Sequence, residues 1–490
     1  MLVSLLVLLA SGCGAPPAPD VLGFGISQAP RHLDPRFATD AVSERIVRLL
    51  YRRLVEFDEH DRPVPGLATW EAVTPRRYQF CLGAQGRDFA DGSRLTAADV
   101  VATYASVLDP ATASPHRAPL ALIAAVAASD ADCLEFTLKE PDALFPAYLG
   151  LGILPAAALA RGHDFARAPL GSGPFRFVAW PAPGRVLLER RADGQRFAFL
   201  AVSDPNVRAM KLLRGEVALL QNDLSPELVA WLRRQPEVRV ATHPGSNFSY
   251  LGFNLEDPVT GRLEVRQALA YALDRPAILR YLFQGLAREA HTLLPPTHWA
   301  GAPELRAPAY DPDRARALLA TLGYDQTRPL RLKFKTSSDP FRLRIATILQ
   351  AQWAAVGIEL TIHSYDWGTF FGDIQAGRFQ LYALTWVGVR TPDIFRHAFH
   401  SAALPPQGAN RGRYRSAMVD RLIEQARAAP DLTVQAALYR ALQAELLHDL
   451  PYIPLWYEDQ VGVLRQELDG YRLAPDGRYD GLATTQKRRM

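Results

Sequence analysis

The residue types that most enzymes use for catalysis occur in this chain without the spacing that catalysis requires. Ser172 lies between two glycines, but the G-x-S-x-G pattern of a nucleophile elbow is absent and Pro174 indicates a tight turn. None of the eleven histidines belongs to an H-E-x-x-H motif or a Cys/His array, although His397 and His400 stand three residues apart. No G-x-x-x-x-G-K-[ST] phosphate loop occurs. We therefore expect no catalytic residue, no metal site and no cofactor.

Several aromatic and polar residues instead favour recognition of a small ligand. Trp386 ends a strand-like run, where an indole can stack on a ligand and donate its N–H, although packing in the core is the alternative. Arg390 can pair bidentately with a carboxylate or phosphate, or can be a solvated loop arginine. Weaker candidates for the rim of a ligand site follow a proline-rich loop: Asn410, Arg411 and Tyr414.

Two of the three cysteines lie in segments that alternate apolar and polar residues, as half-buried strands do. Cys81 is in residues 77–82 and Cys133 is in residues 133–138. If these strands are neighbours, the two cysteines can form a disulfide in an oxidising compartment. Two buried free thiols are the alternative, and the sequence leaves both open.

The third cysteine follows an apolar leader. Residues 2–10 are too few for the ~20 that span a bilayer and are typical of a signal peptide, although no Lys or Arg follows Met1. The sequence before Cys13 resembles the lipobox of bacterial lipoproteins, and the Pro-rich residues after it predict a tether. We expect a signal peptide at 1–12, then a lipidated cysteine and tether at 13–20. A plain secretory signal or a wrongly assigned start codon is the alternative.

Length and composition indicate an exported, globular protein of more than one domain. The 490 residues are too many for one core, and 48% hydrophobic with 22% charged residues is ordinary for a soluble protein. The 55 basic and 51 acidic residues are spread along the chain, so nucleic-acid binding is not expected.

Strand and helix patterns alternate through the chain, which predicts an α/β fold. The pattern predicts a strand at 21–26, an amphipathic helix at 41–57 and a helix capped by Thr96 with Asp99 three residues on. A second α/β region covers about 263–447. These elements must position the candidate residues named above.

The order of motifs resembles the extracellular solute-binding proteins of peptide-type ABC importers, family 5, which include dipeptide- and oligopeptide-binding proteins. The segments that carry the resemblance are, in order, His32-Leu33-Asp34-Pro35, Leu50-Tyr51-Arg52-Arg53-Leu54, Pro65 to Glu71, Phe89 to Val100, Gly171 to Phe175, Phe253-Asn254, Val265 to Arg275 and Asp420-Arg421-Leu422. They span nearly the whole mature chain.

The resemblance implies a two-lobed periplasmic-binding-protein fold of type II, cluster C-like, with a hinge between the lobes and an extra subdomain in the N-terminal lobe. The expected core of lobe I is 21–58 with 166–255 and 455–490. The expected subdomain is 59–165, and lobe II is expected at 256–454.

The same resemblance implies capture of a peptide or peptide-like solute between the lobes and delivery to ABC permease subunits with their ATPases. The protein would be a monomer outside the cytoplasmic membrane, held there by its lipid. Rival functions are a carrier of a non-peptide or metal-chelate ligand, a ligand-sensing or chaperone module on the same fold, and, less favoured, an exported hydrolase.

Site residues follow from the same family pattern. In peptide binders, the stretch matching 382–395 carries a Trp, an aspartate for the substrate's α-ammonium group, and an Asp-Pro pair. Trp386, Gly388 and Pro392 match, but Val389 stands at the aspartate position. The ligand is therefore expected to lack a free amino terminus there, unless Asp393 takes over the role. A predicted crossing strand would expose Asn247 and Tyr250 near the hinge, although either can also be a core residue.

Overall fold

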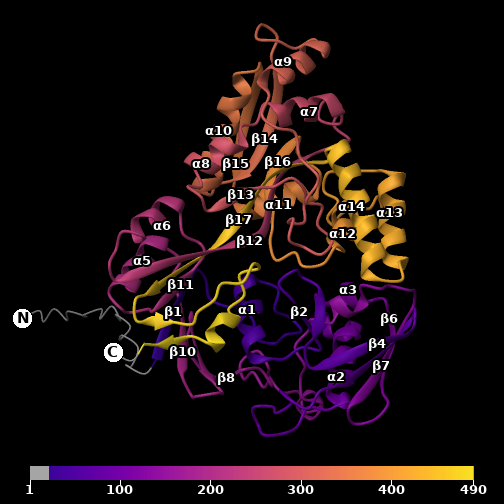
Figure 1. Ribbon diagram of the computed structural model, residues 1–490, viewed down its shortest axis with the longest axis vertical. Coiled ribbons are helices and arrows are strands. Elements are labelled where there is room, and N and C mark those ends of the chain that lie inside the picture. The colour runs from indigo at the N-terminus through magenta and orange to yellow at the C-terminus, as the bar shows by residue number, and fades with distance from the viewer. Residues whose placement is uncertain (1–20, 489–490) are drawn as a thin grey trace, which may run out of the picture.

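One mixed sheet of eleven strands runs through both lobes of the protein. The computed structural model describes residues 21–488 and shows two lobes stacked along the long axis (Figure 1). The strand order is β15-β14-β16-β12-β17-β11-β1-β10-β9-β8, and β13 pairs with β17 off this path. The predicted signal peptide, Cys13 and the tether lie outside the described residues.

The N-terminal lobe is built around β1 (Val21–Ile26), which the sequence pattern predicted with the same bounds. This strand is buried because β10 and β11 flank it in parallel, and such strands are apolar on both faces. The other elements of this part are β8 (Phe175–Ala182), β9 (Arg185–Arg190), β10 (Arg196–Ala201), β11 (Leu219–Gln221), α1 (Ala41–Leu50), α4 (Ala156–Ala160), α5 (Pro205–Leu213), α6 (Pro226–Leu232), β18 (Leu468–Asp469) and β19 (Gln486–Lys487).

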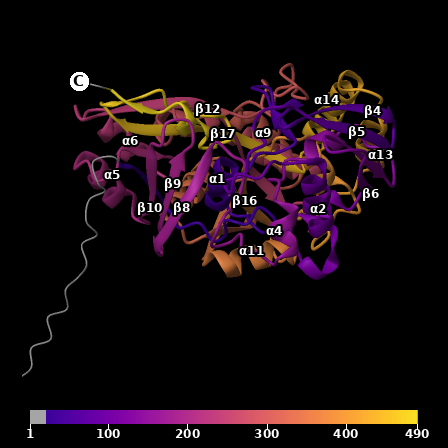
Figure 2. The same ribbon diagram turned by 90° about the horizontal axis from the view of Figure 1, so that it is seen from below.

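An additional subdomain has its own four-stranded sheet and its own apolar core. The sheet has the order β4-β5-β7-β6, and the core contains buried side chains between Leu54 and Ile153. Its elements are β2 (Val55–Phe57), β3 (Pro63–Pro65), β4 (Ala68–Thr74), β5 (Arg77–Leu82), β6 (Ile123–Ala128), β7 (Cys133–Leu138), α2 (Ala97–Leu108) and α3 (Arg117–Leu120). Seen from below, α1 lies between this subdomain and β8–β10 (Figure 2).

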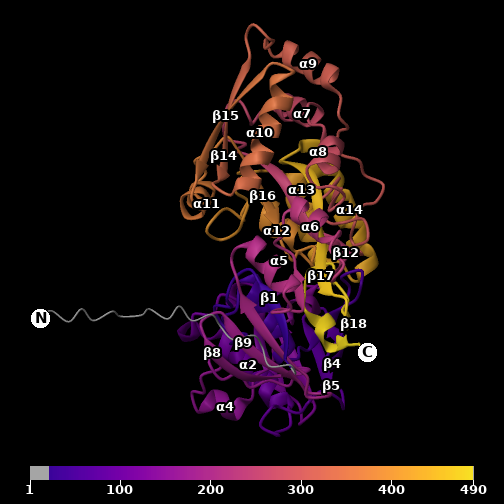
Figure 3. The ribbon, with the colours of Figure 1, turned by 90° about the vertical axis from the view of Figure 1, so that its left-hand side faces the viewer.

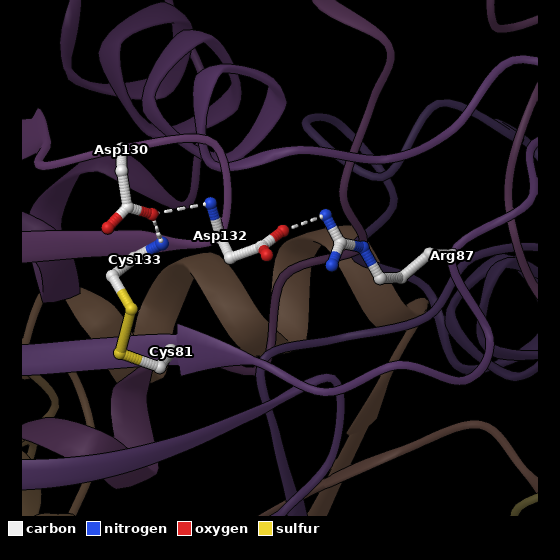
Figure 4. The surroundings of a disulfide bond; sticks show 5 residues. All are labelled: Cys81, Arg87, Asp130, Asp132 and Cys133. Carbon is white, nitrogen blue, oxygen red and sulfur yellow. Dashed lines mark hydrogen bonds and ion pairs between the residues drawn. A yellow bond between two sulfur atoms is a disulfide. The ribbon is translucent and has the colours of Figure 1, made fainter.

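The two cysteines of this subdomain form a disulfide. Cys81 and Cys133 are directly opposite each other in the antiparallel pair β5 and β7, with their Cα atoms 4.2 Å apart (Figure 4). The predicted cap of α2 is also present, because the Asp99 carboxylate accepts the Thr96 backbone N–H at 2.7 Å. Of the two alternatives for the cysteines, the structure therefore has the disulfide.

The second lobe carries the other end of the large sheet, covered by helices. Its strands β14 (Leu330–Ser337) and β15 (Ile358–Tyr365) pair in parallel, and β14 also pairs with β16 (Leu381–Trp386). The remaining elements are α7 (Leu263–Tyr271), α8 (Arg275–Tyr281), β13 (Ala287–Glu289), α9 (Pro312–Thr321), α10 (Pro340–Ala354), α11 (Trp367–Gln375), α12 (Ile394–Phe399), α13 (Ala417–Ala428) and α14 (Leu432–Asp449).

Two long antiparallel strands connect the lobes. β12 (Val238–Phe253) and β17 (Tyr452–Arg465) pair with each other along most of their length, and both run from one lobe to the other (Figure 3). The register of the pair shifts between His243 and Asn247, in the middle of the crossing. The predicted domain boundary between 454 and 455 falls inside β17, so this strand is shared between the lobes.

The helix predicted at 41–57 is wrong in its second half. α1 ends at Leu50, Tyr51 has extended backbone angles, and Val55–Phe57 pairs with Pro63–Pro65 as a two-stranded ribbon. The apolar period continued past Leu50 because the extended segment also buries Leu54 and Val55, in the subdomain core. Arg53 therefore lies in the extended segment after α1 and not on the helix.

Candidate ligand-binding site

A cavity of about 570 Å³ lies between the two lobes. Lobe I contributes residues of α1 and of the segment after it, while lobe II contributes the loop after β16; the C-terminal segment closes a third side. The charged side chains of its lining are Glu44, Arg45, Arg48, Arg53, Arg390, Asp476 and Arg478. A neighbouring cavity of about 180 Å³ shares Glu44, Arg53 and Gly150 with it. The two together form one cleft, large enough for a small solute.

Two arginines of the cleft are held by carboxylates within lobe I and the C-terminal segment. Arg48 pairs with Asp480 at 2.8 Å and with Glu56. Arg478 lies 3.8 Å from Asp476 and 3.5 Å from Asp480. Their charges are thus largely compensated before a ligand arrives.

Arg390 connects the loop after β16 to lobe I, an arrangement that the sequence analysis did not predict. Its guanidinium pairs with Asp476 and lies 5.3 Å from the centre of the Phe57 ring. Burial lowers the pKa of Arg390, and the neighbouring arginines 48 and 478 lower it further. Arg390 therefore lines the cleft but is already occupied by a protein carboxylate, which replaces the solvated-loop alternative.

Arg53 is the exception among these cations. Its side chain is 5% exposed, no carboxylate oxygen among residues 21–488 lies within 4 Å of it, and its Nη1 has no hydrogen-bond partner there. Burial, followed by the positive charge of Arg48, lowers the pKa of Arg53 to about 10. The more distant carboxylates of Glu56, Glu44 and Asp480 raise this pKa in part. The guanidinium is still charged at neutral pH, so a buried cation without a direct ion-pair partner faces the cleft.

The predicted Gly388, in the loop after β16, also lines the cleft. Gly388 has a φ of 69°, in the left-handed region that favours glycine, and a Cβ there would meet open space. The Gly388 N–H donates to the Oδ1 of Asn247 at 3.4 Å. Asn247 therefore supports the loop from the crossing strand, although it does not line the cavity itself.

Trp386 and Tyr250 pack side by side behind the cleft. Their rings are stacked with centroids 6.3 Å apart, and Tyr250 is completely buried, so the prediction that it is exposed near the hinge is wrong. Arg411 lies 4.8 Å from the Trp386 ring, and its Nη1 donates to the Tyr250 hydroxyl at 3.3 Å. The core-packing alternative thus describes Tyr250, while Trp386 is partly buried against the same apolar cluster.

Asn410 and Tyr414 are structural rather than rim residues. Asn410 is 1% exposed; its Nδ2 donates to the carbonyls of Tyr414 and His400, and its Oδ1 accepts the Tyr414 N–H. The Tyr414 hydroxyl donates to Asp449. These contacts satisfy both side chains within lobe II, and the proline-rich loop before them gave no signal of that burial.

The acid proposed to replace the ammonium partner is engaged elsewhere. Both Asp393 carboxylate oxygens accept hydrogen bonds from Arg396 at 2.7 Å. Val389, at the position where peptide binders carry an aspartate, packs partly buried against the lobe II core. Neither residue is among those lining the large cavity.

The lobes touch each other beside the cleft through a second set of charges. Arg427 on α13 pairs with Glu140 at 2.7 Å and with Asp142 at 3.3 Å, both from lobe I. Burial raises the pKa of the Asp142 carboxyl, while Arg427 lowers it. We call these three residues the interlobe clamp.

The turn between β2 and β3 also reaches lobe II. A ring nitrogen of His60 is 3.0 Å from the Thr297 carbonyl, and the Trp299 N–H donates to the His60 carbonyl at 3.0 Å. The neighbouring His298 holds the loop after β16, because its Nε2 is 2.9 Å from the Arg390 carbonyl. Burial lowers the pKa of His298 to about 4, so this ring is neutral at pH 7.

Residues 45, 48, 53, 476 and 478 of the cleft were not predicted from the sequence. The spacing of Arg45 and Arg48 would place both on one face of a helix, which is a weak signal. Arg53 was assigned to the wrong element, and nothing in the C-terminal sequence marks Asp476 or Arg478.

Within residues 21–488, no cluster of three or more His, Cys, Asp or Glu could hold a metal. No helix in that part of the chain is long and apolar enough to cross a membrane.

Known proteins are similar to this chain over nearly its whole length. The family described as bacterial extracellular solute-binding proteins, family 5 Middle, matches residues 62–403. Di/tripeptide-binding protein 2 of Pseudomonas aeruginosa (strain UCBPP-PA14) is 28% identical over 510 residues, 96% of each chain.

Solved structures are similar to this chain over nearly its whole length. CtaP of Listeria monocytogenes, an ABC transporter substrate binding protein, is 24% identical and superposes with a TM-score of 0.86, over 95% of this chain and 99% of its own. DppA of Helicobacter pylori, in complex with the peptide STSA, is 25% identical with a TM-score of 0.78, over 96% and 98%. The predicted two-lobed fold is confirmed.

Proposed function

The chain belongs to family 5 of the bacterial extracellular solute-binding proteins, and we propose that it captures a peptide or peptide-like small solute between its lobes and delivers it to an ABC permease without chemical change. The observation that carries this proposal is the cavity of about 570 Å³ lined from both lobes. A solute bound there contacts both lobes at once, so it favours the closed arrangement over the open one.

The ligand end at lobe II is uncharged or blocked in this proposal. Val389 offers no carboxylate, and Asp393 is already paired with Arg396. Burying an α-ammonium group without a partner costs several kcal/mol. A peptide-like solute without a free amino terminus therefore fits better than an ordinary peptide, and a non-peptide acid on the same fold is the second candidate.

Calorimetry tests the ligand class. Di- to pentapeptides, their N-acetyl derivatives and non-peptide acids of similar size are titrated into the mature protein. We expect N-acetylation to leave the affinity of a bound peptide unchanged or to increase it. Tight binding of ordinary peptides that disappears on N-acetylation would contradict the blocked-terminus proposal. Native mass spectrometry of protein from its natural source identifies a retained solute and separates peptides from metal chelates.

Membrane attachment through Cys13 completes the proposal. The small residues before Cys13 and the Pro-rich residues after it support a lipidated, tethered protein. A carrier held at the membrane surface stays close to the permease subunits that it serves. Fractionation of cells tests this: wild-type protein is expected with the membranes and Cys13→Ser in the soluble fraction, whereas equal distributions would contradict a lipid anchor.

A further inference from the structure

The cations of the cleft fall into two classes. Those held by carboxylates are Arg48, Arg390 and Arg478. Among the described residues, Arg45 and Arg53 have no carboxylate within 4 Å, and Arg45 lies 5.5 Å from the centre of the Tyr479 ring. Only Arg53 is both unpaired and buried. It lines both parts of the cleft.

An unpaired buried guanidinium is costly, and the carboxylates of Glu56 and Asp480 that act on this one are already paired with Arg48. Glu44 is the carboxylate that shares both cavities with Arg53, but it is 43% exposed and its nearest cationic partner is His116 at 3.7 Å. A buried donor with no acceptor destabilises the folded protein, and more so when it is charged. Such a group persists in a ligand site when the ligand supplies the missing acceptor.

We propose that Arg53 is the anion anchor of the cleft, to which the bound solute presents a carboxylate or another oxyanion. This inference rests on the proposed function and names the chemical class of its ligand. The guanidinium has five donors in a planar fork, which matches a carboxylate or phosphate bidentately. The half-buried Arg390, which lobe II contributes to the lining, already has Asp476.

The two ends of the cleft then differ in charge. At the lobe I end, Arg53 requires an acid. At the lobe II end, Val387 and Gly388 line the cavity, and the only charged lining residue of that loop is the paired Arg390. The fitting solute is therefore an acid at one end and neutral at the other, such as a peptide-like molecule with a free carboxylate and a blocked amine.

The first test uses inorganic phosphate as the smallest oxyanion. The melting temperature of wild-type protein, Arg53→Gln and Arg344→Gln is measured in phosphate and in chloride at equal ionic strength. Arg344 forms an exposed pair with Glu227 and controls for loss of one arginine. We expect phosphate to raise the melting temperature of wild type and Arg344→Gln but not of Arg53→Gln. An equal rise in all three, or no rise in wild type, would overturn the anchor.

The second test uses N-acetyl-dialanine and its C-terminal amide, which differ only in the carboxylate. For wild type we expect calorimetry to show the acid binding roughly 10- to 100-fold more tightly than the amide, as loss of one charge-assisted pair predicts. Arg53→Gln is expected to remove the difference and Arg53→Lys to restore part of it. Binding of both compounds with no difference would overturn the anchor.

These two tests also separate the inference from the proposed function. If phosphate acts through Arg53 but no peptide-like compound binds, the peptide-like ligand is wrong and the anchor stands. If the acid and the amide bind equally and Arg53→Gln changes neither, capture of a peptide-like solute stands and the anchor is wrong. Circular dichroism of Arg53→Gln and Arg53→Lys confirms that each variant is folded before it is titrated.

Discussion

The interlobe clamp and the cleft both place buried charge between the lobes, but only the clamp pairs all of its charge with protein side chains. In the clamp, Arg427 of lobe II finds Glu140 and Asp142 on lobe I, so the protein itself completes the ion pair. In the cleft, Arg53 of lobe I has no carboxylate oxygen within 4 Å among residues 21–488, although Glu56, Glu44 and Asp480 act on it from farther away. The clamp pairs its charges across the lobes within the protein, whereas Arg53 leaves one charge of the cleft for a solute to pair.

Removal of the disulfide is expected to have the largest effect on stability. It also serves as a control for the interlobe clamp and the cleft. Cys81→Ser with Cys133→Ser opens a loop whose ends are 52 residues apart, and the lost chain constraint costs about 4 kcal/mol of unfolding free energy. Because the disulfide lies in the outer sheet of the subdomain, ligand affinity is expected to stay within ~3-fold of wild type. Urea unfolding and calorimetry measure the two effects. A large loss of affinity would mean that the subdomain and the cleft are coupled.

Replacing the clamp arginine is expected to have the next largest effect. Arg427→Leu leaves the Asp142 carboxylate, which is 1% exposed, without its cation. Removal of one partner from a buried ion pair costs about 3 kcal/mol. We expect the closed arrangement to lose that stabilisation, so the radius of gyration from small-angle scattering should increase. Arg427→Lys retains the charge and is the matched control. An unchanged radius would show that the clamp does not hold the lobes together.

The same kind of substitution in the cleft is expected to act in the opposite direction on stability. Burial lowers the pKa of Arg53, which means that folding disfavours its charged form. Arg53→Gln removes that uncompensated charge and should raise the free energy of unfolding of ligand-free protein by about 1–2 kcal/mol. Urea unfolding checks the sign. A loss of stability like that of Arg427→Leu would mean that Arg53 has a structural role instead.

A pH dependence is expected for the loop that carries Arg390, because His298 contacts it. The folded-state pKa of His298 is about 4, below its ordinary value of about 6.5, because the ring is buried. Its stabilising contribution is therefore complete above pH 6.5 and is lost as the pH falls toward 4, by about 1 kcal/mol per unit. Unfolding free energies of wild type and His298→Gln, measured between pH 4 and 7, should differ in slope. Parallel profiles would contradict a neutral, buried His298.

The sequence predicted where part of the ligand site lies better than it predicted which side chains bind the ligand. Local patterns were sufficient for β1, the strands that carry the cysteines and the cap of α2, because each depends on neighbours in the chain. Gly388 and Arg390 were also found, since family motifs mark the loop after β16.

The remaining site depends on contacts between distant segments. Arg390 meets Asp476 across 86 positions of sequence, and no local pattern announces that pair. Arg53 was hidden by a helical period that tertiary packing interrupts after Leu50. Tyr250 and Asn410 looked available because aromatic and amide side chains serve cores and ligands equally well, and only burial distinguishes the two uses.

A structure of the protein purified from its natural source, with its retained solute, is the decisive experiment. We expect a carboxylate or phosphate group of the solute about 3 Å from the Arg53 guanidinium, with the neutral end of the solute near Gly388. A solute that leaves Arg53 unpaired, or that presents an ammonium group to the loop of Gly388 and Arg390, would contradict it.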